Sequence, residues 1–534
     1  MQRPSVFVSI IRFVSQLLFQ GIMIAQANAA TVLGIEAHPI TVEVDVAIGL
    51  SAFNIVGLPD NTIRESRDRI LAALSNCGFA LPPRKIVVNL APAQLKKVGA
   101  GFDLPIAVAL LAAMGHCPAE RLKNCLFAGE LSLEGSLRSV RGVLPMALMA
   151  RRQQLSQLVL PVANELEAGV VPELQRVPVK HLRDVIAFLR NEQDFPQTEL
   201  DAESLFQQHQ QLGEDLQDVK GQEHVKRALE VAAAGGHNLL MLGPPGSGKT
   251  MLARRMVSIL PPPSFDEALE VTQIHSIAGL LPADRPLLGT RPFRTPHHTI
   301  SSAGLAGGGS IPGPGEISLA HNGVLFLDEL PEFPRAVLEL LRQPLEDRRL
   351  TISRSAMAPE FPCDFMLLAA MNPCPCGFYG SPVGSQSCRC SPHLVQKYRS
   401  KISGPLLDRI DLHLQVPVVD PSELGDQRRG ESSTTIRHRV TVARRVQEQR
   451  FLNSPTRSNA GMSRRELENF ATPSPAALKL LEQAMQQMQL SARAYDRILK
   501  VANTIADLAG VETIDTPQLA EAVQYRGLDR PLPV

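Results

Sequence analysis

The chain has 534 residues, which is too long for a single hydrophobic core and suggests about three domains. It is 44% hydrophobic and 20% charged, an ordinary composition for a globular protein, and its eight Cys do not suggest a disulfide scaffold. A net charge of +1 excludes a global attraction to nucleic acid or membrane, and 4% aromatic residues without Trp argue against a base-stacking platform.

The first 29 residues resemble a secretion signal. An apolar run over residues 6–24 is followed by the small residues Ala27-Asn28-Ala29, but Arg12 interrupts the run and it is too polar to span a bilayer comfortably. We expect residues 1–29 to be an N-terminal extension or a misassigned start, with Met23 as the alternative beginning. We expect no membrane contact and a cytoplasmic protein, with secretion as the less favoured alternative.

Short strands alternate with helices over residues 30–190, and this pattern predicts an α+β domain. The predicted elements are strands over Thr41–Val46, Lys85–Leu90 and Leu158–Pro161, a hairpin over Gly129–Leu137, and helices over Asp60–Asn76, Leu104–Met114 and Leu144–Arg152.

The order of Gly129–Leu131, Val140–Gly142, a helix and Leu158–Pro161 resembles the proteolytic domain of Lon proteases, which has the ribosomal protein S5 domain 2-like fold. Such proteases need a Ser nucleophile and a Lys base. The resemblance puts Gly101 near the Ser position and Leu144 near the Lys position. It therefore implies a proteolytically inactive domain, for which a substrate-guiding role is expected.

A polar segment over 191–217 predicts a linker to an α/β domain over 218–421. A strand over Asn238–Leu242 in that domain runs into a glycine-rich turn and a helix. The turn contains, in order, Gly243, Pro244, Pro245, Gly246, Ser247, Gly248, Lys249 and Thr250.

This turn predicts a phosphate site, because glycines let backbone N–H groups surround phosphate oxygens and the helix N-terminus attracts negative charge. Lys249 is expected to reach the β- and γ-phosphates of ATP, and the Thr250 hydroxyl to hold Mg²⁺. An ordinary Gly-rich turn is the alternative if this motif is taken alone.

Two more apolar runs, Gly323–Leu327 and Phe365–Met371, predict buried parallel strands. The first ends in Asp328, which suits the Mg²⁺ shell, and Glu329, which suits the polarising of an attacking water. The second ends in Asn372, which is placed to sense the γ-phosphate. Together with the glycine-rich turn they favour a hydrolytic ATPase over a passive nucleotide binder.

Two further groups of residues are candidate metal ligands. A Gly- and Pro-rich insertion includes residues 291–299 and 307–316. Within it, His297 and His298 favour loop packing or phosphate contact over metal binding. Four thiols in the loop 374–390 predict a structural Zn²⁺ site, with reduced thiols or a redox role as alternatives. These thiols belong to Cys374, Cys376, Cys388 and Cys390.

The insertion, with Val324–Glu329, Asn372–Gly377 and Gly404–Leu412, closely resembles the ComM (YifB) family of magnesium-chelatase-like AAA+ ATPases. The resemblance covers nearly the whole chain from about residue 30. It implies a hexameric ring helicase that promotes branch migration of DNA during natural transformation, with a recombinase as a candidate partner.

The resemblance also assigns roles to three single residues. Gln222 lies near the adenine, and Arg409 is an arginine finger that acts on the ATP of a neighbouring subunit. Arg493 is the second sensor on the helical lid. The alternatives are an ion pair of Arg409 with a neighbouring Asp and a solvated helix face for Arg493.

A predicted hairpin after Arg348 carries Arg354, which we expect to contact DNA phosphate, with ordinary surface charge as the alternative. In related hexameric helicases, a hairpin just before the sensor strand enters the pore.

Residues 422–534 predict a C-terminal helical lid with a basic first helix. Two rival functions stay open: the ATPase subunit of a metal chelatase, and a protein remodeller or protease.

Overall fold

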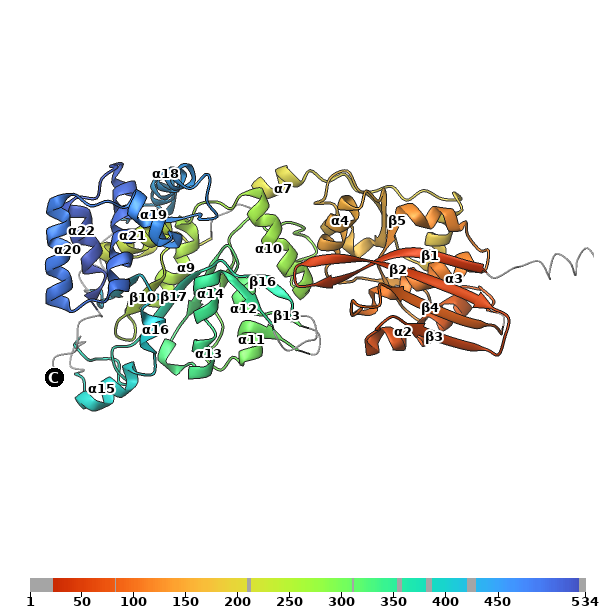
Figure 1. Cartoon of the computed structure of the whole chain (residues 1–534), viewed down its shortest axis with the longest axis horizontal. Coiled ribbons are helices and arrows are strands. Elements are labelled where there is room, and N and C mark those ends of the chain that lie inside the picture. Colours follow the sequence, from red (N-terminus) through yellow and green to blue (C-terminus); the bar gives the residue numbers. More distant parts are fainter. Residues whose placement is uncertain are drawn as a thin grey trace, which may run out of the picture. The chain divides into compact units, whose positions relative to one another are not determined.

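The computed structural model describes residues 23–81, 83–208, 213–309, 312–352, 358–380, 387–419 and 429–527 (Figure 1). The chain divides into two compact units. The first contains the residues up to Leu205 together with Thr272–Leu288, and the second contains Phe206–Val271 together with the chain from Gly289 onward. No helix among the described residues is long and apolar enough to cross a membrane.

The first unit is built on a mixed sheet of seven strands. Its strands are β1 (Met23–Leu33), β2 (Glu36–Ala47), β3 (Ala52–Val56), β4 (Lys85–Ala91), β5 (Cys125–Phe127), β8 (Gln157–Pro161) and β9 (Gln175–Val179). Their order is β3-β4-β2-β1-β5-β8-β9, and the predicted hairpin forms from β6 (Glu130–Leu131) and β7 (Leu137–Arg138). The helices are α2 (Asn61–Asn76), α3 (Asp103–Ala113), α4 (Val143–Arg152), α5 (Glu165–Ala168) and α6 (Leu182–Leu189).

Strand β1 corrects the predicted boundary at residue 29. Residues from Met23 onward pair with β2 along its whole length, and Ala25, Ala27 and Ala29 are at most 3% exposed. The small residues that resemble a cleavage site therefore form the buried face of a strand, because alternate positions of a strand point to the same face.

The predicted linker is also partly ordered. Helix α7 (Ala202–Gln208) lies within it, Gln197 accepts a hydrogen bond from the Arg176 backbone N–H (2.9 Å), and Leu216 is buried. Polar side chains such as Gln197 hold this segment against the first unit. Its sequence therefore lacks the apolar periodicity by which a packed segment is recognised.

The second unit contains a five-stranded parallel sheet with the order β11-β14-β17-β10-β18. Its strands are β10 (Leu239–Leu242), β11 (Phe293–Arg294), β14 (Val324–Leu327), β17 (Met366–Met371) and β18 (Leu412–Gln415). Two short antiparallel pairs accompany it: β12 (Gly307–Gly308) with β13 (Gly313–Pro314), and β15 (Arg349–Thr351) with β16 (Glu360–Pro362).

The longer helices around this sheet are α8 (Glu223–Gly235), α9 (Lys249–Ile259), α10 (Phe265–Ala278) and α15 (Pro392–Arg399). The shorter ones are α11 (Ser302–Ala306), α12 (Glu316–Leu319), α13 (Arg335–Glu339), α14 (Arg342–Asp347) and α16 (Gly404–Leu407). The chain from residue 272 to 288, which includes the second half of α10, belongs to the first unit, so the predicted 218–421 domain is not continuous.

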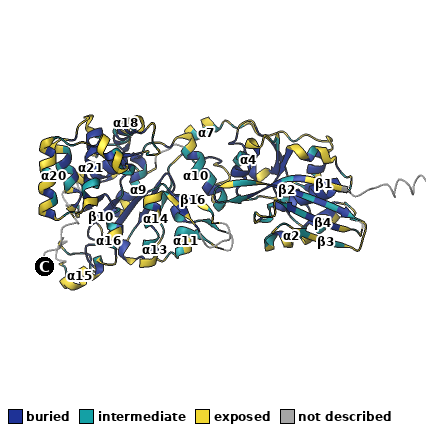
Figure 2. Ribbon diagram, viewed as in Figure 1, coloured by how far each residue is buried: buried dark blue, intermediate teal, exposed yellow. Residues whose placement is uncertain are grey.

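Within the described residues 429–527, five helices form the C-terminal part: α18 (Ser433–Arg450), α19 (Arg464–Phe470), α20 (Pro475–Met488), α21 (Ala492–Ala509) and α22 (Thr516–Gln524). In α20 the buried residues Ala477, Leu481, Ala484 and Met488 recur every three or four positions, and its other face is exposed (Figure 2). The predicted lid shares one hydrophobic core with the sheet, since Val440 and Ile498 belong to the same cluster as Leu239.

Candidate functional site

The glycine-rich turn joins β10 to α9 at the carboxyl edge of the parallel sheet. Gly246 and Gly248 have φ values of +78° and +85°, which a side chain would strain. Gly243 is packed so closely that an added Cβ would lie 2.2 Å from the carbonyl oxygen of Val416. The backbone therefore forms a close-fitting cradle at a helix N-terminus, where an anion is favoured.

Lys249, at the start of α9, is 8% exposed. Its Nζ donates to the carbonyl oxygens of Gly243 (2.8 Å) and Pro244 (2.9 Å) and lies 3.3 Å from Oδ1 of Asn372. Burial lowers the pKa of Lys249, and the charge of Asp328 opposes that shift. No described carboxylate lies within ion-pair distance of this buried cation, so the residues fit a phosphate chain.

Thr250 and Asp328 are brought together from α9 and the end of β14. The Thr250 hydroxyl donates to Oδ2 of Asp328 at 2.6 Å, and the Glu329 backbone N–H donates to Oδ1 at 2.9 Å. A hydroxyl and a carboxylate are the oxygen ligands that Mg²⁺ prefers beside phosphates, so this pair fits the metal of an ATP site.

Glu329 has a φ of +53°, a backbone conformation that costs a non-glycine residue about 1–3 kcal/mol and is typical of active sites. Its Oε2 lies 3.4 Å from Nδ1 of His298, whose ring packs edge-on against Phe333. His297 turns instead to the Thr299 hydroxyl at 2.9 Å. The sequence favours loop packing or phosphate contact for the two His, and only their position in a Pro-rich loop hints at the contact of His298 with Glu329.

Gln222 contacts the glycine-rich turn from the start of α8. Its Nε2 donates to the carbonyl oxygens of Ser247 (3.0 Å) and Pro417 (2.9 Å), and its φ of +57° is again left-handed. Gln222 thus supports the loop directly, while its contact with adenine stays a prediction.

Arg409 and Arg493 lie at the opposite edge of the sheet. Arg409 comes just before β18, donates to the carbonyl oxygen of Pro405 (2.6 Å) and pairs with Glu346. Arg493, at the start of α21, lies 3.6 Å from Asp408. The structure groups these two arginines at the amino edge and separates them from Lys249 by the length of the strands.

The four Cys of the loop form a compact group. The Sγ of Cys374 lies 3.3 Å from that of Cys376 and 3.7 Å from that of Cys388, and all four sulfurs lie within 4.8 Å of one another. A tetrahedral site with Zn–S bonds of about 2.3 Å has sulfurs about 3.8 Å apart. Hydrogen bonds from the backbone N–H groups of Phe378 and Arg389 lower the pKa of Cys376 to about 6. The group fits a metal.

Gly377 connects this group to the ATP site. An added Cβ at Gly377 would lie 2.6 Å from Cδ of Pro245 in the glycine-rich turn.

The predicted DNA contact, Arg354, lies outside the described residues, although strands β15 and β16 form the predicted hairpin on either side of it.

Three family models match the chain. Their descriptions are magnesium chelatase, subunit ChlI (residues 215–424), subunit ChlI of Mg-chelatase (42–164) and magnesium chelatase, subunit ChlI C-terminal (430–526). The competence protein ComM of Haemophilus influenzae is 44% identical over 502 residues, which cover 93% of this chain and 96% of that protein. The chain belongs to the ComM/YifB family of magnesium-chelatase-like proteins.

Two YifB proteins agree with this assignment. The Escherichia coli protein is 44% identical over 93% of this chain and 96% of its own, and the Salmonella typhimurium protein is 42% identical over 95% and 98%. Membership of the ComM/YifB family implies an AAA+ ATPase that uses ATP and Mg²⁺, as the grouping of Lys249, Thr250 and Asp328 independently indicates.

Proposed function

We propose that the protein is an ATP-driven DNA motor, a ring-forming helicase that promotes branch migration when incoming DNA recombines during natural transformation. The action on DNA is supported by the similarity to competence protein ComM over almost the whole length of both chains. The ATPase part is supported by the convergence of Lys249, Asp328 and Asn372 at one sheet edge.

In this proposal ATP bound with Mg²⁺ supplies the energy-rich phosphoanhydride bond. Lys249 holds the phosphate chain, Thr250 and Asp328 hold the metal, and Glu329 accepts a proton from the attacking water. Asn372, which contacts Lys249, reports the state of the γ-phosphate. Gln222 supports the loop and lies beside the adenine.

Arg409 and Arg493 complete the site of a neighbouring subunit. They lie at the amino edge, away from their own Lys249, so one chain alone does not bring all the catalytic groups together. We therefore propose a ring, most simply a hexamer, in which each amino edge faces the next carboxyl edge. Arg354 is proposed to contact DNA, and a recombinase is proposed as a partner in the cytoplasm.

We also propose that the first unit has a Lon-like fold without protease activity. Gly101 lacks a side-chain nucleophile, and Leu144 is a buried hydrocarbon at the start of α4. These residues support a role in guiding substrate instead of cleaving it.

The test is ATP hydrolysis by the purified protein without DNA, with single-stranded DNA and with a four-way junction, using Lys249→Ala as the blank. Stimulation by DNA together with movement of the junction is the expected result. Hydrolysis that depends on Lys249 but ignores every DNA would overturn the DNA motor. That outcome would favour a chelatase-type or protein-remodelling ATPase, and the descriptions of the family models support the chelatase type as the second candidate.

A further inference from the structure

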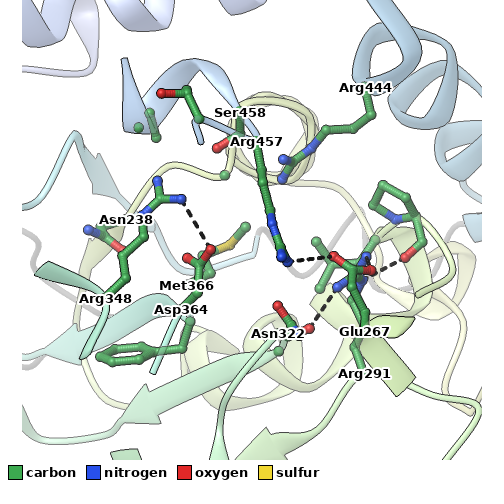
Figure 3. A pocket seen from close by; sticks show the side chains of 18 of the residues that line it. Asn238, Glu267, Arg291, Asn322, Arg348, Asp364, Met366, Arg444, Arg457 and Ser458 are labelled. Carbon is green, nitrogen blue, oxygen red and sulfur yellow. Dashed lines mark hydrogen bonds and ion pairs between the residues drawn. The ribbon is translucent and has the colours of Figure 1, made fainter. Parts of the chain in front are cut away.

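Two neighbouring cavities lie in the second unit away from the glycine-rich turn, and they share Leu260, Pro261, Pro263 and Arg291. The larger, of about 810 Å³, lies at the amino edge of the sheet (Figure 3). Its arginines have carboxylate partners or cap carbonyl groups. Arg457 and Arg291 both approach Glu267, at 3.7 and 2.9 Å, and Arg444 donates to the carbonyl oxygen of Ala233. The larger cavity therefore needs no added anion.

The smaller cavity, of about 480 Å³, has a different charge balance. Arg254 of α9, Arg291 before β11 and Arg437 of α18 all line it. The carboxylate in its lining, Glu214, is paired with Arg255 at 2.8 Å. Within the described part of the chain, neither Arg254 nor Arg437 has a carboxylate within ion-pair distance.

Arg437 is the least satisfied of the three arginines. Its Nε is buried and has no hydrogen-bond partner among the described residues. Burial and then the nearby charge of Arg291 lower the pKa of Arg437. A buried donor without an acceptor is unfavourable, and a second cation close by adds repulsion, so an anion in the cavity would relieve both.

The rest of the lining suggests what the anion is attached to. Val257, Leu260 and Phe293 give the cavity an apolar wall, and its volume lies in the ordinary range for small ligands. Ser258, also in the lining, lies nine residues after Lys249 on α9, which is about 13 Å along the helix, so the cavity is separate from the ATP site.

We propose that this cavity is a second nucleotide site, where arginines hold the phosphate and the apolar wall receives the base. The nucleotide is either free or part of a DNA strand, since both present the same phosphate and base. The site takes no part in hydrolysis, so the proposal goes beyond the function proposed above and does not depend on it.

The test compares Arg254→Gln and Arg437→Gln, singly and together, with Arg445→Gln as the matched control. Arg445 is an exposed residue of the same helix α18 as Arg437, and it has no described partner. All variants are made in the full chain with Lys249→Ala, so that the ATP site contributes little. The probes are a fluorescent 20-nucleotide oligothymidylate, titrated at several salt concentrations, and thymidine monophosphate in calorimetry.

For the DNA source, the double variant should bind the oligonucleotide about tenfold more weakly, and its log–log salt slope should fall by about 1–2. For the free-nucleotide source, it should lose binding of thymidine monophosphate. Arg437→Lys, which keeps the charge, should retain most of the binding. Binding of both probes unchanged by the double variant, or reduced equally by Arg445→Gln, would overturn the proposal. Unfolding midpoints check that each variant is folded.

Discussion

The carboxylate of Glu329 is held by a strained backbone on one side and by His298 on the other. Because His298 touches Glu329 and no described group of the phosphate cradle, we expect His298→Ala to lower kcat about ten- to a hundredfold with little change in the KM for ATP. His298→Asn, which keeps a side-chain N–H donor, should recover part of the rate. Steady-state kinetics measure both parameters.

His297→Ala is the control for that substitution, because the His297 ring lies beside that of His298, 4.1 Å between centroids, but bonds to Thr299. It should remain close to the unsubstituted protein. A His298→Ala variant that changed only KM, or that lost no more activity than His297→Ala, would remove His298 from the positioning of Glu329.

His413 on β18 makes stability depend on pH. Burial and the charge of Arg526 lower its pKa to about 3, whereas an unfolded His titrates near 6.5. Its contribution is therefore fully present above about pH 6.5 and is lost as the pH falls toward 3. Between pH 7 and pH 5 this amounts to about 2 kcal/mol. Chemical denaturation at these two values should show a smaller loss for His413→Gln, and an equal loss would contradict the assignment.

The four Cys hold two described segments of the chain together, residues 374–380 and 387–390, and neither segment contains a helix or strand. We expect about one zinc per chain by mass spectrometry, and Cys388→Ser should lose that zinc. Since Gly377 in this loop packs against Pro245, loss of zinc should also weaken ATP binding several-fold. Cys363→Ala, a buried thiol outside the group, should keep its zinc. Protein purified without chelators that contains no zinc would exclude the site.

Elements with a strong local pattern follow from the sequence nearly to the residue. Helices α20 and α22 of the predicted lid begin at strong local signals, because Ser474-Pro475 and Asp515-Thr516-Pro517 provide N-caps and a helix-starting Pro. Strands β10, β14 and β17 follow from the sequence as well, because each is an apolar run with an abrupt end. The glycine-rich turn follows β10, and Asp328 and Asn372 follow the other two.

Other features depend on contacts that no local pattern records. The sequence does not predict strand β1, because its small alanines are also typical of a signal-peptide cleavage site. Helix α10 is divided between the two units, with its residues up to Val271 in the second unit and those from Thr272 in the first, and no local pattern marks that division. The pairing of His298 with Glu329 joins residues 31 positions apart through loops, so only the folded chain brings them together.

For the whole molecule, the position of Arg409 predicts that it serves the ATP site of a neighbouring subunit in an assembly. We expect Arg409→Ala and Glu329→Gln each to abolish ATP hydrolysis. If Arg409 serves the neighbouring site, an equal mixture of the two variants, dissociated and reassembled, should regain up to about a quarter of the normal activity, since one interface in four then combines both intact groups. A mixture as inactive as its parts would place Arg409 in the site of its own chain.

The first unit is completed by a piece of chain that is synthesised after the glycine-rich turn. Ser276, from the residue 272–288 segment, donates to Glu167 at 2.5 Å, and Gly142 donates to the carbonyl oxygen of Ser276 at 3.3 Å. A fragment that ends at Leu205 would leave the buried carboxyl of Glu167 without this partner. Folding during translation therefore cannot finish the first unit before residues 206–271 of the second unit have left the ribosome. A protease cut within 206–271 should leave two fragments that stay associated, because the first unit contains residues from both fragments.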